Sequence, residues 1–186
     1  YSWGDNNNGQ LGTGGTVKSS SPVQIGSDTD WSKVACGYVH VSAIKTDGTL
    51  WGWGSNTSGQ VGDGTRVSKS SPVQIGALTN WSQISSGDNF TMAIKTDGTL
   101  WGWGYQGGDG KIGDNTRTNR SSPVQIGSDT NWSQVLAGRS HMLARTTDGE
   151  IYVAGSSGSG QLGLNIGPTA YRSSPTQIGS ISTWTG

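Results

Sequence analysis

Two histidines are the side chains of this 186-residue protein that titrate closest to neutral pH. His40 ends the stretch GYVH and His141 ends the stretch GRSH. A third copy of the pattern reads GDNF and places Phe90 at the same position. A position that accepts phenylalanine suits packing better than proton transfer, so we expect the histidines to be structural and predict no catalytic residue.

Metal binding and paired-carboxylate catalysis are also disfavoured. Asp63 in GDGT and Asp114 in GDNT resemble fragments of calcium loops, but the EF-hand spacing and its terminal glutamate are missing. Both read more simply as turns closed by the aspartate side chain. Glu150 is the only glutamate, which leaves acid–base chemistry to aspartates in separate turns. The sequence therefore predicts a protein that is not an enzyme, with no metal site and no cofactor.

Cys36 is the only cysteine, so the chain cannot form an internal disulfide. Ser86 and Ala137 stand at the equivalent places in the other copies. We therefore expect Cys36 to be a small buried residue and not a reactive thiol.

The composition favours short strands over helices. The chain has 32 glycines and nine tryptophans, while hydrophobic residues make up only 30%. Twelve basic and twelve acidic residues give a formal net charge of zero, which disfavours nucleic acid as a partner. The sequence has no apolar stretch near the ~18 residues of a membrane span, so we predict no membrane insertion.

An internal repeat of about 50 residues organises the chain. One proline and one tryptophan recur with spacings of 50, 51 and 52 residues. These residues are Pro22, Pro72, Pro123 and Pro175, and Trp31, Trp81, Trp132 and Trp184. The units are approximately 1–50, 51–100, 101–150 and a partial unit 151–186, which together form a single domain or an excerpt of one.

Each unit predicts four short strands. SSPVQIG (70–76) is a strand opened by proline, WSQISSG (81–87) is a second strand, and residues 90–104 form a hairpin around Asp97-Gly98. Tryptophans at alternate positions of the last strand point to one face and predict packing between adjacent sheets. Tyr152 and Ala154 are their counterparts in the last copy, which we expect to be offset in register. We assign a structural role to Trp3, Trp53, Trp103, Trp31, Trp81, Trp132 and Trp184.

The unit resembles the repeat of the regulator of chromosome condensation family. The shared features are G-Q-[LV]-G (9–12, 59–62 and 160–163), then Pro, a Gly-x-x-[HF] step and Asp-Gly; the third copy departs with GKIG (110–113). The resemblance covers essentially the whole chain, as about three and a half repeats. It implies an all-β fold of four-stranded antiparallel blades, part of a β-propeller that is usually seven-bladed in this family. We expect the 186 residues to be an excerpt of a longer chain, with closure by a second copy as the alternative.

Members of that family perform unrelated functions, including guanine-nucleotide exchange, ultraviolet-B sensing and β-lactamase inhibition, so fold does not choose among them. The basic extension and the inserted wedge of the exchange factor are not visible here. The sensing tryptophans of the photoreceptor lie beside the Gly-x-x-His step, and none occurs in residues 37–41, 87–91 or 138–142. Exchange or another regulatory function remains an alternative.

The candidate binding surface comes from the windows that change most between copies. Tyr38-Val39, Asp88-Asn89 and Arg139-Ser140 are aromatic, acidic and basic in turn, and each follows the same glycine. We expect these turns at the mouth of the propeller channel, where they would bind a protein or a glycan. The predicted binding residues are Tyr38, Val39, His40, Asp88, Asn89, Phe90, Arg139, Ser140 and His141.

The sequence therefore predicts a non-enzymatic binding scaffold. A purely structural assembly or spacer module is the alternative, with self-association through open propeller edges. The chain is poor in Lys and Glu and rich in Asn, Ser, Thr and Gly. This composition suits an extracellular, cell-surface or virion location.

Overall fold

The computed structural model describes residues 1–167 and 169–179, and these residues form strands and no helix. The N-terminal sheet has two strands, β1 (Ser2–Gly4) and β2 (Ser19–Val23). Three four-stranded sheets follow, and we call them blades 1, 2 and 3. Blade 1 comprises β3 (Trp31–Cys36), β4 (His40–Lys45), β5 (Leu50–Gly54) and β6 (Lys69–Gln74). Blade 2 comprises β7 (Trp81–Ser86), β8 (Phe90–Lys95), β9 (Leu100–Gly104) and β10 (Arg120–Gln125). Blade 3 comprises β11 (Trp132–Ala137), β12 (His141–Thr146), β13 (Ile151–Ser156) and β14 (Tyr171–Gln177).

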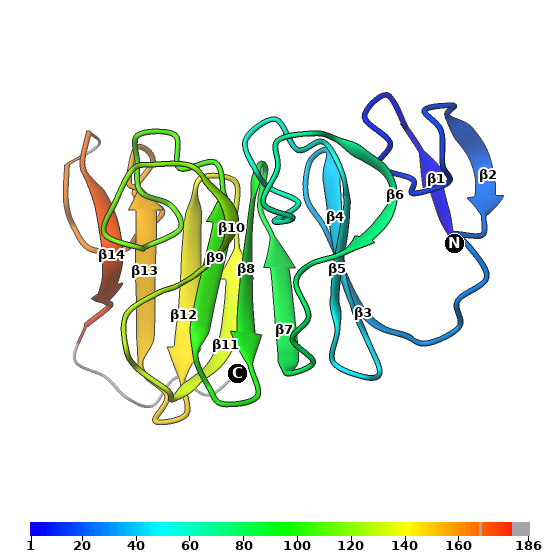
Figure 1. Cartoon of the computed structure of the whole chain (residues 1–186). Coiled ribbons are helices and arrows are strands. Elements are labelled where there is room, and N and C mark those ends of the chain that lie inside the picture. Colours follow the sequence, from blue (N-terminus) through cyan, green and yellow to red (C-terminus); the bar gives the residue numbers. More distant parts are fainter. Residues whose placement is uncertain (168, 180–186) are drawn as a thin grey trace.

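The strands of each blade follow chain order and pair antiparallel, as the sequence predicts. Each blade begins at the tryptophan strand and ends at the proline strand, so it takes strands from two sequence units. Figure 1 shows the sheets side by side, with the long connections at one end and the Asp-Gly hairpin turns at the other. None of the described residues form a helix that is long and apolar enough to cross a membrane.

The Asp-Gly turns close the hairpins as predicted. Gly48 and Gly98 have φ angles of 80° and 77°, a region that glycine adopts freely. A Cβ on Gly48 would lie 2.1 Å from the carbonyl oxygen of Thr79 in the next connection. Glycine is therefore required both for the turn and for its close approach to the following blade.

Tryptophans fill the interfaces between blades, which confirms the predicted packing. Trp103 is buried among Ile44, Leu50 and Ile75 of blade 1. Its indole nitrogen donates to the carbonyl oxygen of Gln60 at 3.0 Å. Trp53 makes the same bond to Gln10 at 3.0 Å. Trp81 and Trp132 are also buried, Trp31 is half-buried, and Trp184 lies outside the described residues.

Trp3 is exposed and is not part of a core, which corrects the role expected for it. It occupies the position of Trp53 and Trp103, but no described sheet packs on its face. Incomplete cover explains why Cys36 is exposed and not buried as expected. Both Cys36 and Val34 face the N-terminal sheet, which has only two strands to cover them. Val34 is 67% exposed, whereas the equivalent Val135 is 3% exposed.

Blade 3 keeps the register of the other blades, so the expected offset of Tyr152 is wrong. Tyr152 pairs with Ala144 as Trp101 pairs with Ala93. Ala154 takes the place of Trp103, and the methyl group of Met142 fills the vacated space. A Cβ on Gly113 would lie 3.2 Å from that methyl group, where the equivalent Cβ on Gly62 would lie 2.6 Å from the Trp103 indole nitrogen.

Candidate binding surface at the variable turns

The three predicted turns meet around one hollow. The hollow has a volume of about 250 Å³ and is lined by three equivalent segments, one from each blade. These segments are Cys36–Tyr38, Ser86–Asp88 and Ala137–Arg139. The first strands of neighbouring blades contact each other, which brings their turns together. The structure thus places residues about 50 positions apart in sequence on one surface.

The turns share a backbone frame that leaves two positions free to vary. The amide of Gly37 donates to the carbonyl oxygen of His40 at 2.8 Å, and Gly87 donates to Phe90 at 2.9 Å. A Cβ on Gly37 would lie 2.3 Å from the His40 ring, so the glycine is needed for this packing. The two residues between glycine and His or Phe contribute no side chain to this frame. Their identity can therefore change without disturbing the blade.

The exposed side chains of the hollow differ in chemistry. Tyr38 is 78% exposed, and its amide donates to the carbonyl oxygen of Asp88 at 3.3 Å. The guanidinium of Arg139 pairs with the Asp88 carboxylate at 3.1 Å. Because both groups of this ion pair are solvated, the pair contributes only about 0–1 kcal/mol to stability. A phenol, a carboxylate and a guanidinium thus remain accessible to a partner.

Two of the predicted binding residues do not reach this surface. His40 and Phe90 are fully buried, because each packs under its own turn glycine. The Nε2 atom of His40 lies 2.9 Å from the Thr91 hydroxyl in blade 2. Burial lowers the pKa of His40 to about 4. The two side chains support the hollow from below and cannot contact a ligand directly, which corrects their assignment.

The remaining predicted residues are half-buried. Val39, Asn89 and Ser140 use their carbonyl oxygens to accept hydrogen bonds from amides at the end of the third strand of each blade, at 2.8, 2.8 and 2.9 Å. His141 is half-buried, and burial lowers its pKa below the usual value. Tyr38, Asp88 and Arg139 are therefore the predicted residues whose side chains are best placed for binding.

Lys111 and Tyr105 lie beside the same turns, although the predicted binding residues did not include them. Lys111 is buried, with its ammonium nitrogen 5.0 Å from the ring centre of Tyr105 and 6.0 Å from that of Phe90. Burial lowers the pKa of Lys111, and Asp109 and Asp88 oppose this effect. The signal was present in the sequence, because Lys111 replaces the glutamine of the G-Q-[LV]-G motif in the third copy.

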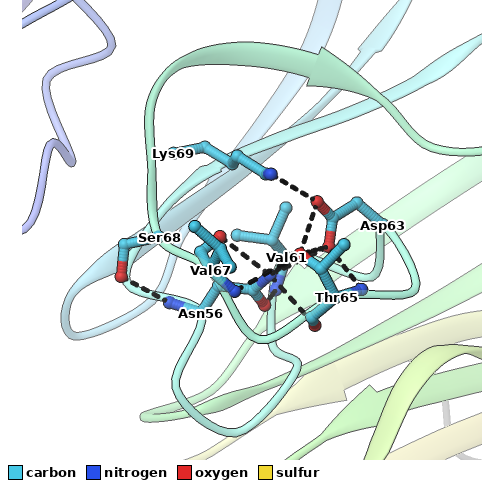
Figure 2. A network of polar contacts seen from close by, with 7 residues as sticks. All are labelled: Asn56, Val61, Asp63, Thr65, Val67, Ser68 and Lys69. Atoms are coloured by element: carbon cyan, nitrogen blue, oxygen red, sulfur yellow. Dashed lines mark hydrogen bonds and ion pairs between the residues drawn. The ribbon is translucent and has the colours of Figure 1, made fainter.

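The buried side-chain amide of Asn56 organises the long connection of blade 1 beside the turns (Figure 2). Asn56 donates to Asp63 at 2.9 Å and to the carbonyl oxygen of Val67 at 3.3 Å, and it accepts from the amide of Val61 at 3.0 Å. Lys69 pairs with Asp63 at 3.0 Å. The connection is therefore a folded support for the hollow.

Aspartate carboxylates of the described residues mainly stabilise turns. Within residues 1–167 and 169–179, no group of three or more His, Cys, Asp or Glu side chains could hold a metal ion. The carboxylates of Asp63, Asp47 and Asp97 are engaged in their own turns by threonine hydroxyls and amides. These bonds hold the pKa values of Asp47 and Asp97 below their usual value, as expected for carboxylates that stabilise turns.

The repeat, the blade and the turn geometry agree with a known family. The family model described as the regulator of chromosome condensation (RCC1) repeat matches residues 1–44, 47–94 and 97–145. The chain belongs to the RCC1 repeat family. A second model with the same description matches residues 31–60, 81–110 and 132–161.

Solved structures share the fold. Human WBSCR16 is 23% identical, with a TM-score of 0.78, and the match covers 94% of this chain and 46% of that one. Yeast RCC1 (Prp20) bound to Kap60 is 22% identical, with a TM-score of 0.78, and the match covers 97% and 44%. A second structure of Prp20p, from Saccharomyces cerevisiae, gives 22% identity and a TM-score of 0.77, with 97% and 46% covered. The RCC1-repeat chain described here thus spans less than half the length of these proteins.

Proposed function

We propose that this RCC1-repeat chain is a non-enzymatic scaffold that binds a protein partner at the hollow between its variable turns. The observation that carries the proposal is the convergence of Tyr38, Asp88 and Arg139 on one surface above a constant frame. Tyrosine and arginine are enriched among the residues that dominate binding energy at interfaces. Exposed Tyr38 beside an exposed ion pair offers both anchor types within one hollow.

The structural relatives support a protein as the partner. One Prp20 structure contains Kap60, and the other was determined together with the binding properties of Prp20p to Gsp1p and histones. A glycan is the second ligand class consistent with a solvated, aromatic surface. The composition further supports a location outside a cell or on a virion, as the sequence predicts.

The test compares two variants that change equivalent positions at opposite ends of the blades. The first replaces Tyr38, Asp88 and Arg139 with alanine. The control replaces Thr46, Thr96 and Thr147, which are exposed beside the Asp-Gly turns, with alanine. Wild-type protein and both variants are used as bait against a displayed peptide library and a glycan array, and each hit is measured by calorimetry.

We expect hits that bind the wild type and the threonine variant with equal affinity. Loss of the two anchors should weaken binding at least about 30-fold, as for residues that dominate an interface. Hits that bind the alanine turn variant as tightly as the wild type would show that this hollow is not the binding surface.

Assembly is a second candidate function, favoured by the N-terminal end. Two hollows of about 330 and 470 Å³ lie between the N-terminal sheet and blade 1 and share Tyr1, Val34 and Trp53 in their lining. Strand β1 pairs only with β2, so its other edge is free in the described part. Light scattering after size exclusion tests this candidate function. A wild-type dimer that becomes a monomer when Val34 is replaced with lysine would support assembly, whereas a monomeric wild type would exclude it.

A further inference from the structure

Two equivalent lysines at the Asp-Gly end of the blades differ in how their charge is neutralised. Lys45 ends β4 and Lys95 ends β8, and each lies across from the first tryptophan of its blade, Trp31 or Trp81. Each ammonium group lies over two indole rings. Blade 1 therefore serves as a reference for blade 2, because the two lysines share the same strands, the same register and the same aromatic neighbours.

The charge of Lys45 in blade 1 is fully paired. Its ammonium nitrogen lies 2.7 Å from the carboxylate of Asp28 and 3.2 Å from that of Asp30. The hydrogen bond to Asp28 is the main reason that the pKa of Lys45 is raised. Asp28 remains half-exposed, so this carboxylate reaches the lysine from the solvent side.

Blade 2 keeps the lysine and loses both carboxylates. Leu78 and Asn80 stand where blade 1 has Asp28 and Asp30, as the constant six-residue spacing from Ile25 to Trp31 and from Ile75 to Trp81 shows. Lys95 is only 6% exposed, and no carboxylate lies within 4.0 Å of its ammonium nitrogen among the described residues.

The neighbours of Lys95 show the same imbalance. The ammonium nitrogen is 3.6 Å from the ring centre of Trp101, against 4.7 Å between Lys45 and Trp51. Asp97 raises the pKa of Lys95, but its Oδ1 atom is held by Thr99 and desolvation prevails, so the pKa is lowered.

Blade 3 has no lysine at this position. Thr146 replaces the lysine, and Asn131 donates to Asp148 at 3.2 Å. Within the three blades, the cation is therefore paired in the first, retained without a carboxylate in the second and removed in the third. A nearly buried ammonium group without an anion is costly, because the indole rings replace only part of its hydration.

We propose that Lys95 is a binding site for an external peptide carboxylate, which would take the place that the Asp28 side chain takes in blade 1. Leu78 is 49% exposed at that place and offers an apolar contact to the same ligand. A carboxylate next to an apolar side chain is the chemistry of a C-terminal residue such as leucine. The site lies at the opposite end of the blades from the variable turns and does not depend on the function proposed for them.

The test uses the 186-residue protein with N-acetyl-leucine and N-acetyl-leucinamide, which lacks the carboxylate, as probes. NMR of the lysine side chains and tryptophan indoles follows each titration. The key variant carries Leu78→Asp and Asn80→Asp, which transplants the carboxylates of blade 1. A second variant, Lys95→Met, removes the charge and keeps a long side chain, and Lys45→Met is its matched control in blade 1.

We expect N-acetyl-leucine to bind saturably, to shift the Lys95 and Trp101 signals and to raise the pKa of Lys95. The amide, the double aspartate variant and Lys95→Met should each weaken binding by at least about tenfold, as expected for loss of a charge-assisted contact. Lys45→Met should bind as the wild type does.

Equal binding of the acid and the amide would overturn the proposal, and so would unchanged binding by the double aspartate variant. Acetate binding as tightly as N-acetyl-leucine would overturn the role of Leu78. Failure of this site leaves binding at the variable turns unaffected, because those residues are unchanged in every variant.

Discussion

At the scale of single residues, His40 links the blade 1–blade 2 interface to pH. Burial lowers its pKa from 6.5 to about 4, so the unfolded chain binds the proton more readily between these values. The contribution of neutral His40 to the free energy of unfolding should therefore be fully present above pH 6.5. It should fall by about 3 kcal/mol as the pH drops to 4. Urea unfolding between pH 4 and 7 measures this fall.

The control for this prediction is His40→Phe, which copies the residue found at the equivalent Phe90. That variant should lose most of the pH dependence and keep the parts that come from His141 and, near pH 4, from carboxylates such as Asp47 and Asp97, whose pKa values are also lowered. Identical pH profiles for wild type and variant would show that His40 is not the group responsible.

Met142 and Ala154 are paired across β12 and β13, and the size of each side chain compensates for the size of the other. Met142→Thr alone leaves a cavity and should cost about 2 kcal/mol. Ala154→Trp alone overpacks the interface and should cost about 1–3 kcal/mol. The double variant recreates the Thr91–Trp103 arrangement of blade 2 and should recover at least about 1 kcal/mol relative to the sum of the single changes. Chemical unfolding of all four proteins measures this coupling, and simple additivity would show that the two sites do not share volume.

At the scale of elements, the length of each long connection matches the length of the buried amide side chain within it. Asn56 serves a connection that is one residue shorter, between Gly54 and Gly59, than the one served by Gln106. Gln106 donates to Asp114 at 2.7 Å and accepts from the amide of Ile112 at 3.1 Å, as Asn56 does with Asp63 and Val61. Asn56→Gln alone should cost about 1–3 kcal/mol, because the longer side chain does not fit and leaves buried groups unpaired.

Replacing Asn56-Thr57 with Gln-Gly-Gly supplies the missing residue and should restore most of that stability. The inserted glycines match Gly107 and Gly108, whose φ angles of 59° and 79° suit glycine. Thermal unfolding of the two variants beside the wild type tests the idea. If the longer connection is no more stable than Asn56→Gln alone, loop length and amide length are independent.

The same elements show what the sequence could and could not predict. Four antiparallel strands per unit follow from alternating residues and Asp-Gly turns, which are local signals. Trp3 and Trp103 share the local sequence Trp-Gly, yet one is exposed and the other buried, because burial depends on the neighbouring sheet. The hollow at the variable turns could be predicted from the repeat, whereas the buried position of His40 depends on contacts with blade 2.

At the scale of the whole molecule, the N-terminal sheet is the weakest part of the described fold. Strand β5 is held between β4 and β6, whereas the equivalent β1 pairs with β2 alone. Two-stranded sheets are marginally stable in water, and such regions open locally. Hydrogen-bonded amides of β1 and β2 should therefore exchange at least about 100-fold faster than those of β5 and β6.

Native-state hydrogen exchange at two protein concentrations makes this prediction decisive. Fast exchange in β1 and β2 at both concentrations is the result expected for an isolated two-stranded sheet. Slow exchange that becomes fast on dilution would instead mean that a second copy covers the free edge of β1 and the hollows beside Val34. Slow exchange that does not change with concentration would contradict both views, because the protection would then have to come from the two strands themselves.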